Sequence, residues 1–219
     1  MPRRLNLPDS ASVATPDENG RLYAPSAARN VQAIADLIAH VAPPPGKALE
    51  LASGTGQHIC AFAARFPDMT WQPSEIDEVR RASITAYAKD SGLTNIAPVI
   101  ALDATAPGWG AENGGYSLIL LSNLLHLISD DEAETLVTEA AKALTPGGLL
   151  LVYGPFMRDD ELTSDGDREF HQSLQAQDPE IGYKSDFDVI DWGVEAGLDV
   201  ADVVEMPANN LSLIWRRVF

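Results

Sequence analysis

A glycine-rich turn holds the first residues that could bind a ligand. Glu50, Gly54 and Gly56 lie within ELASGTG, residues 50–56, between an apolar stretch and a predicted helix. Glycine has no Cβ, so its backbone can turn sharply and approach a ligand closely. The carboxylate of Glu50 can accept hydrogen bonds from an ammonium group. The pattern predicts a site built from backbone amides and one acid, although a tight strand-to-helix turn would use the same glycines.

The spacing of the glycines separates two cofactor classes. A nicotinamide dinucleotide fingerprint requires a third glycine three residues after the second, where this chain has Ile59. S-Adenosylmethionine has no pyrophosphate, and its amino-acid end needs amides for the carboxylate and an acceptor for the ammonium group. Glu50 is such an acceptor, so the turn favours S-adenosylmethionine.

Two further acids follow predicted strands. Glu75 lies nineteen positions after Gly56, where an acid typically accepts hydrogen bonds from ribose hydroxyls. Asp77 could take that role instead, or could cap the next helix. Asp103 could accept from the exocyclic amine of adenine, or could be a solvated strand end.

Asn123 and His126 follow the next predicted strand, at a position that faces cofactor and substrate in such folds. Asn123 offers a donor and an acceptor. His126 could be a general base if the nucleophile is an alcohol or an acid, and the alternative is a packed or capping histidine. Transfer of a methyl group from a sulfonium mainly requires orientation and desolvation, so a thiolate or an amine would need little help from a base.

Alternating strands and helices must position these residues. The pattern predicts a helix capped by Ser26 that ends before Pro43, further helices at about 57–66, 77–92, 129–144, 166–177 and 186–197, and strands at about 47–51, 69–74, 95–104, 116–123, 149–156, 198–206 and 211–219. We therefore expect an α/β, Rossmann-like fold with a mostly parallel seven-stranded sheet, helices on both faces and a C-terminal antiparallel hairpin. Such folds bind ligands at the carboxyl ends of their strands.

Length and composition favour one domain at 21–219 after a flexible polar tail at 1–20. The N-terminus lacks the apolar core of a signal peptide, and the single cysteine gives neither a disulfide nor a metal cluster. We expect a cytoplasmic protein without a membrane segment. The formal charge of −17 disfavours nucleic acid as a partner, because such affinity rests largely on basic residues. The oligomeric state stays open between monomer and homodimer.

The ordered motifs of residues 30–155 resemble class I S-adenosylmethionine-dependent methyltransferases. The segments PSAARN, LASGTGQH, WQPS, YGPF and MPANNL, across residues 23–217, resemble more closely the family called domain of unknown function 938, which includes the methyltransferase-like 26 proteins. The resemblance implies the fold and S-adenosylmethionine, but no substrate. The chain departs from the family pattern at Glu75, where aspartate is usual, and at residues 128–130, where an aromatic or Ser-Pro-Trp-like segment is usual.

The resulting hypothesis is methyl transfer from S-adenosylmethionine to a small molecule. The alternatives are a non-catalytic regulatory or partner-binding module that binds the cofactor, and a protein or RNA methyltransferase. The predicted cofactor-binding residues are Glu50, Ala52, Ser53, Gly54, Gly56, Glu75, Asp103, Ala104 and Asn123. The predicted catalytic residues are His126 and Tyr153. The predicted substrate-binding residues are Tyr23, Arg29, Asn30, Phe156, Asn209 and Asn210, and no metal site is expected.

Several of these residues also have a simpler interpretation. Tyr23 could anchor the tail, and Arg29 could pair with local acids. Tyr153 and Phe156 could be packing residues of the core or its rim. Asn209 and Asn210 lie between two predicted strands and could serve only the turn.

Overall fold

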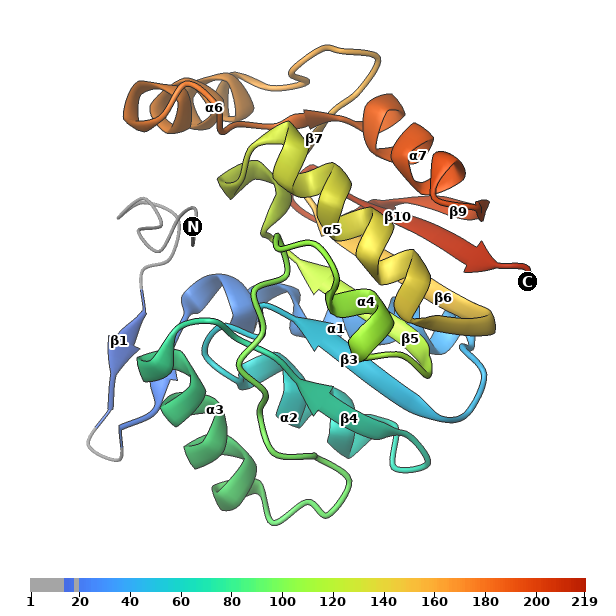
Figure 1. The fold of residues 1–219 in the computed structure, drawn as a ribbon. Helices are drawn as coiled ribbons and strands as arrows, with labels where there is room; N and C mark the ends of the chain where they lie inside the picture. The colour runs from blue at the N-terminus through green and yellow to red at the C-terminus, as the bar shows by residue number, and fades with distance from the viewer. Residues whose placement is uncertain (1–13, 18–19) are drawn as a thin grey trace.

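A six-stranded sheet forms the middle layer of the protein in a computed structural model that describes residues 14–17 and 20–219 (Figure 1). The strand order is β4-β3-β5-β6-β10-β9. Neighbours among β3, β4, β5 and β6 pair in parallel, whereas β10 pairs antiparallel with β6 and β9. The strands are β3 (Lys47–Leu51), β4 (Thr70–Pro73), β5 (Tyr116–Ser122), β6 (Leu144–Gly154), β9 (Leu198–Met206) and β10 (Asn210–Arg217). The α/β architecture and the C-terminal hairpin are confirmed.

The predicted strand at 95–104 is present only as two bridges, so the sheet has six strands rather than seven. Ile96 forms a parallel bridge with Trp71 of β4, and Ile100 forms one with Ser74, the residue after β4. Pro98 lies between the two bridges and has no N–H to donate to a ladder. Its carbonyl instead accepts a hydrogen bond from Gln72 Nε2 at 2.7 Å. The proline therefore keeps this edge segment beside β4 without regular pairing.

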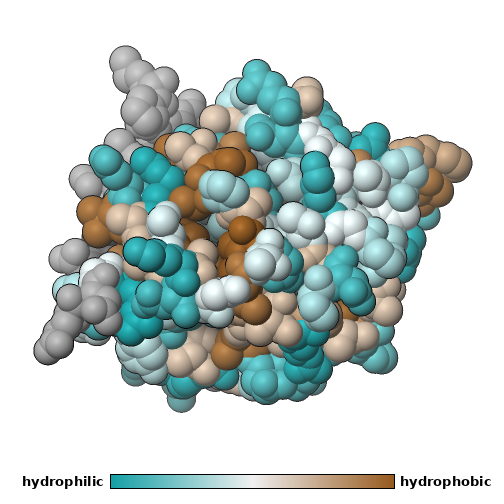
Figure 2. All heavy atoms as spheres, turned by 90° about the horizontal axis from the view of Figure 1, so that it is seen from below, coloured by the Kyte–Doolittle hydropathy of each residue, from teal (hydrophilic) through white to brown (hydrophobic). Residues whose placement is uncertain are grey.

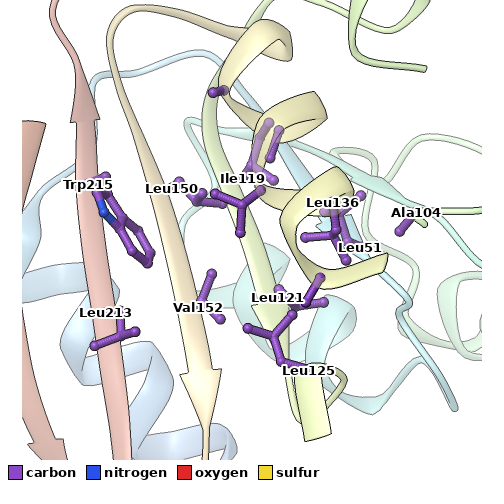
Figure 3. Packing of buried hydrophobic residues seen from close by; sticks show 14 of the residues in the cluster. Leu51, Ala104, Ile119, Leu121, Leu125, Leu136, Leu150, Val152, Leu213 and Trp215 are labelled. Carbon is purple, nitrogen blue, oxygen red and sulfur yellow. The ribbon is translucent and has the colours of Figure 1, made fainter. Parts of the chain in front are cut away.

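Helices cover both faces of the sheet because its strands alternate apolar residues between two layers. The layer around Ile34, Phe62 and Ile84 joins α1 (Pro25–Val41), α2 (Gln57–Arg65) and α3 (Glu78–Ser91) to one face. The layer around Leu136 and Val189 joins α4 (Trp109–Glu112), α5 (Asp130–Ala143) and α7 (Asp186–Glu195) to the other. Figure 3 shows the second layer, where side chains of β3, β5, β6 and β10 pack beside α5.

Shorter elements complete the end of the sheet where the parallel strands finish. They are β1 (Thr15–Pro16), β2 (Leu22–Tyr23), the 3₁₀ turn η1 (Leu125–Leu127), β7 (Phe156–Met157), α6 (Asp165–Gln177) and β8 (Lys184–Ser185). Within the predicted tail at 1–20, Thr15–Pro16 pairs antiparallel with Leu22–Tyr23. Residues 1–13 and 18–19 lie outside the described residues, so the tail stays a prediction there.

The predicted caps at the starts of two helices had different outcomes. Helix α1 begins at Pro25 after Ala24 and has no side-chain cap, so the predicted cap at Ser26 is wrong. Proline suits the first helical position because it lacks an N–H that would stay unpaired there. In α5, the predicted capping box of Ser129 and Glu132 is confirmed.

Exposed apolar side chains lie at several places on the surface. Ile76 and Val79 are 43% and 65% exposed at the start of α3. On the face that Figure 2 shows, hydrophobic residues lie in small groups between hydrophilic ones. Among the described residues, none of the helices has the length and apolar character needed to cross a membrane.

Candidate functional site

The carboxyl ends of β3, β4, β5 and β6 meet at one edge of the sheet (Figure 1). Backbone hydrogen bonds hold these ends together. Ser53 N donates to Ser74 O at 2.8 Å, and Asn123 N donates to Tyr153 O at 2.8 Å. The chain segments that carry the predicted cofactor residues after β3, β4 and β5 are thus adjacent in space.

The turn after β3 uses left-handed backbone conformations, as the glycines predicted. Gly54 has φ +59° and Gly56 has φ +95°. A Cβ on Gly56 would lie 2.8 Å from Ile84 Cα, whereas one on Gly54 would meet no atom within 3.7 Å. Close approach to a ligand was predicted for both glycines, but Gly56 makes room for α3. At Gly54, a Cβ would be in ordinary van der Waals contact with Ala52 O and the Arg80 side chain.

Glu50 is the most unusual carboxylate of the site. Its side chain is 2% exposed, and Oε2 has no hydrogen-bond partner in the described part of the chain. Burial raises the pKa of Glu50 to about 8, the Ser53 hydroxyl opposes this rise, and the nearby charge of Glu75 adds to it. A buried acceptor without a partner is costly, so a ligand donor such as an ammonium group fits this position.

Glu75 and Asp77 both follow β4, but their carboxylates make different hydrogen bonds. Glu75 is buried, and its two oxygens accept from the backbone N–H groups of Gly54 (3.0 Å) and Asp77 (3.1 Å). Each carboxylate oxygen has a further lone pair for a ligand hydroxyl. Asp77 Oδ1 accepts from Arg80 N at 2.8 Å and caps α3. The capping interpretation of Asp77 is confirmed, and Glu75 is left as the acid beside the turn.

Asp103 and Ala104 lie in the loop after the bridged segment. Asp103 Oδ1 accepts from the backbone N–H and the hydroxyl of Thr105, at 3.0 and 2.7 Å. Ala104 O accepts from the indole N–H of Trp109 at 3.0 Å. Both residues are held in defined positions by neighbours in the same loop, and their contact with adenine stays a prediction.

His126 and Asn123 follow β5 in different environments. Asn123 is half-buried and has a left-handed backbone conformation with φ +56°. His126 is 6% exposed and meets the rings of Phe170 and Tyr183 edge-on. Burial, helped by the charge of Lys184, lowers the pKa of His126 to about 3. This environment gives His126 little capacity to accept a proton near neutral pH.

A second histidine, which the sequence analysis did not select, lies among the predicted residues. His58 Nε2 is 2.7 Å from Asn30 Oδ1, and its Nδ1 is 3.4 Å from Ser122 Oγ and 3.7 Å from Glu50 Oε1. Its position four residues before the buried Phe62 places a polar side chain on the apolar face of α2. A histidine at a position where the helical pattern requires an apolar residue was therefore the signal in the sequence that could have identified His58.

Some of the predicted substrate-binding and catalytic residues are buried, and others are exposed. Asn30 and Tyr153 are buried, and Asn30 Oδ1 lies 2.7 Å from His58 Nε2. Tyr23 and Arg29 are exposed. Phe156 is 3% exposed within the apolar layer that contains α5.

Asn209 and Asn210 have partners other than the residues around Glu50. Asn209 Nδ2 donates to Thr163 Oγ1 and to Asp167 Oδ2, which joins the β9–β10 turn to the start of α6. Asn210 Nδ2 donates to the carbonyls of Pro207 and Ala208 at 3.0 and 3.2 Å. The contacts of Asn210 agree with turn chemistry, those of Asn209 instead tie the turn to the segment before α6 and to α6, and a role of either residue toward a substrate stays a prediction.

Known structures share this fold. An O-methyltransferase family protein from Burkholderia thailandensis superposes with a TM-score of 0.76 at 20% identity, over 88% of this chain and 57% of that one. An O-methyltransferase family 2 protein from Planctomyces limnophilus, in complex with apigenin, gives 0.73 at 22% identity, over 88% and 60%. Human N-acetylserotonin methyltransferase, in complex with S-adenosylmethionine, gives 0.70 at 16% identity, over 89% and 53%.

The chain thus spans little more than half the length of these structures, and the likeness shows a methyltransferase-type fold. The family comparison covers nearly the whole chain. Residues 21–217 match the model of the family described as "Protein of unknown function (DUF938)", to which this chain therefore belongs.

Proposed function

We propose that this protein is a methyltransferase that uses S-adenosylmethionine and acts on a small molecule. The observation that carries the proposal is Oε2 of Glu50, which is buried where the glycine turn begins and has no hydrogen-bond partner among the described residues. A buried carboxyl oxygen without a donor favours a ligand that brings one. The amino-acid end of S-adenosylmethionine brings an ammonium group together with a carboxylate that the amides of the turn can bind.

The remaining predicted cofactor residues suit the rest of that ligand. Glu75 would accept hydrogen bonds from the ribose hydroxyls, because its oxygens keep free lone pairs beside Gly54. Asp103 would accept from the adenine amine. Ala52, Ser53, Ala104 and Asn123 would line the site with backbone and small side chains. When bound, S-adenosylmethionine supplies a methyl group on a sulfonium that is already a good leaving group.

The protein's own part is then to orient the acceptor and exclude water. Asn30 and Tyr153 are buried polar side chains, and they would bind the acceptor. His126 would stay neutral near pH 7, since burial holds its pKa at about 3. An acceptor that ionises by itself, such as a thiol or an acid, therefore fits better than one that needs a strong base. The complexes of similar folds with apigenin and S-adenosylmethionine support a small-molecule reaction.

Isothermal titration with S-adenosylmethionine, S-adenosylhomocysteine and NAD tests the cofactor. We expect micromolar binding of the first two and no binding of NAD. Asp103→Ala and Gly54→Val should each abolish binding while unfolding stays cooperative, because one removes the adenine acceptor and the other puts a branched side chain at a left-handed φ.

Binding of NAD alone, or unchanged affinity for S-adenosylmethionine in both variants, would contradict the proposal. Failure of the folded wild type to bind any of the three would favour a partner-binding module. Where binding occurs, small thiols, acids and amines are the first acceptors to screen for release of S-adenosylhomocysteine.

A further inference from the structure

Residues 15–17 and 20–24 form an N-terminal strap that lies along α3 (Figure 1). Arg21 of the strap reaches Asp90 of α3 at 3.2 Å, and its guanidinium carbon lies 5.2 Å from the centroid of the Tyr87 ring. Arg21 also pairs with Asp17 inside the strap at 2.8 Å. Exposed ion pairs of this kind stabilise little by themselves, so the buried side of the strap has to supply the main attachment.

Two backbone N–H groups attach the strap to the helices below it. Leu22 N donates to Ser83 Oγ of α3 at 2.8 Å, and Ala24 N donates to Gln57 Oε1 of α2 at 2.6 Å. In an extended segment, residues two positions apart direct their N–H groups to the same edge. Since β1 pairs with the other edge of β2, the strap is held from both sides. Ser83 is fully buried, so its bond to Leu22 is shielded from water.

The same two side chains also hold the glycine turn, residues 52–56. Ser83 Oγ donates to Thr55 O at 2.7 Å, and Thr55 Oγ1 donates to Gln57 Oε1 at 3.0 Å. Thr55 is buried, and its own N–H has no hydrogen-bond acceptor among the described residues. An unpaired amide in a buried turn favours a ligand that brings an acceptor. The carbonyl and the hydroxyl of Thr55 are therefore fixed by side chains that also bind the strap.

The hydroxyl of Ser83 connects the strap to the turn directly. It has one hydrogen to donate, which goes to Thr55 O, and its lone pairs accept from Leu22 N. Without this hydroxyl, a backbone N–H of the strap and a backbone carbonyl of the turn would both lose their partner. The turn is held on its other side by Glu75, which accepts from Gly54 N at 3.0 Å. The position of the turn thus depends on the strap as well as on the acid after β4.

We propose that Ser83 is a positioning residue that couples docking of the N-terminal strap to ligand binding at the glycine turn. The inference rests on the proposed function, because it takes the turn to be the place where the amino-acid end of S-adenosylmethionine binds. Such coupling is reciprocal. The docked strap raises the affinity of the turn for the ligand by the same factor by which the ligand favours the docked strap. Ser83 itself touches neither cofactor nor acceptor.

Hydrogen exchange of the Leu22 and Ala24 amides, followed by NMR, measures docking of the strap. Saturation of the wild type with S-adenosylhomocysteine should slow exchange of both amides about tenfold, a typical size for such coupling. Calorimetry should show that Ser83→Ala weakens binding of S-adenosylhomocysteine by a similar factor. The agreement of the two factors tests the coupling, since a purely structural role of Ser83 would not make exchange in the wild type depend on the ligand.

Ser91→Ala is the matched control on the same helix. Ser91 Oγ also donates to a backbone carbonyl, that of Ala88 at 2.7 Å, and accepts from a backbone N–H, that of Leu93 at 3.2 Å, but it is exposed and lies away from the strap. This variant should change neither affinity nor exchange. Gln57→Met removes the second link between strap and turn and should also weaken binding. Circular dichroism identifies the folded variants, and Gln57→Met decides the matter if Ser83→Ala does not fold.

Failure of the inference and failure of the proposed function give different results. If the wild type binds S-adenosylhomocysteine but exchange at Leu22 and Ala24 does not slow, the coupling is wrong and the proposed function stands. Wild-type affinity in folded Ser83→Ala, or an equal loss of affinity in Ser91→Ala, would likewise overturn the role of Ser83. If the folded wild type does not bind S-adenosylhomocysteine at all, the proposed function falls and the coupling falls with it.

Discussion

Glu50 and Asp167 are two carboxylates in opposite electrostatic environments. Glu50, at the end of β3, is buried with one oxygen unpartnered, and burial raises its pKa to about 8. Burial alone would also raise the pKa of Asp167, at the start of α6, but hydrogen bonds from Ser164, Tyr183 and Asn209 outweigh it and lower the pKa. Asp167 is thus stabilised as an anion by the folded chain itself, whereas Glu50 lacks a donor that a ligand could provide.

This contrast distinguishes Asp167, a carboxylate that stabilises the fold, from Glu50, a carboxylate suited to binding a ligand. Hydrogen-bonded polar groups fix elements relative to one another, and the bonds of Asp167 join α6, the segment after it and the β9–β10 turn. An unsatisfied buried group costs stability and is kept where it serves a ligand. Replacing Glu50 should therefore reduce ligand affinity without loss of stability, whereas replacing Asp167 should reduce stability with little change in affinity.

The largest expected effect is on ligand affinity in Glu50→Gln. Glutamine cannot ionise, so S-adenosylhomocysteine binding should weaken about a hundredfold, or roughly 3 kcal/mol, because the ligand ammonium can no longer draw residue 50 into a carboxylate form that is its buried ionic partner. The free energy of unfolding at pH 7.5 should be unchanged or higher, since an amide needs no proton to stay buried. Titration calorimetry and urea unfolding measure the two quantities.

Glu139→Gln is the matched control for that change. Glu139 is 3% exposed on the other face of the sheet, but its oxygens accept from Gly110 N at 2.8 Å and from Lys142 Nζ at 2.7 Å. This variant should lose stability and keep its affinity. Equal affinity losses in both variants would remove the distinction between the two kinds of carboxylate.

A smaller effect is expected in the pH dependence of stability. Between about pH 4.5 and 8, folded Glu50 keeps a proton that the unfolded chain has released, so the free energy of unfolding falls as pH rises. One pH unit corresponds to about 1.4 kcal/mol, so Glu50 should remove roughly 2 kcal/mol between pH 5.5 and 7. The buried histidines, His58 and His126, have lowered pKa values and act in the opposite sense.

The difference between wild type and Glu50→Gln isolates the contribution of Glu50, because both proteins contain these histidines. Urea unfolding at a series of pH values measures it. The advantage of the glutamine variant should grow as pH rises toward 8. A difference that is constant over this range would mean that Glu50 ionises normally.

The smallest expected effect is that of Asp167→Ala. The variant loses the acceptor for the hydroxyls of Ser164 and Tyr183, which should cost about 1–2 kcal/mol in the free energy of unfolding. Affinity for S-adenosylhomocysteine should stay within about threefold of the wild type. Asp165→Ala, a control at an exposed ion pair, should cost less than about 0.5 kcal/mol. A hundredfold loss of affinity in Asp167→Ala with normal stability would place Asp167 among the binding residues instead.

The sequence by itself determined the elements whose signals are local. Alternation of apolar residues and the turn at 52–56 predicted the central strands, and the Ser129–Glu132 spacing predicted the start of α5. It also identified Glu50 and Glu75 as acids at strand ends, because a strand end can be recognised from a few neighbouring residues.

Tertiary structure decided what these residues contact. Gly56 makes room for Ile84, a residue 28 positions later, and His58 bonds Asn30 across the same separation. The segment around Pro98 meets β4 and the residue after it only at two bridges, and Pro98 O accepts a hydrogen bond from the side chain of Gln72, 26 positions earlier. Such contacts depend on how distant helices and strands pack, and the periodicity of one element carries no information about the side chains that another element brings to it.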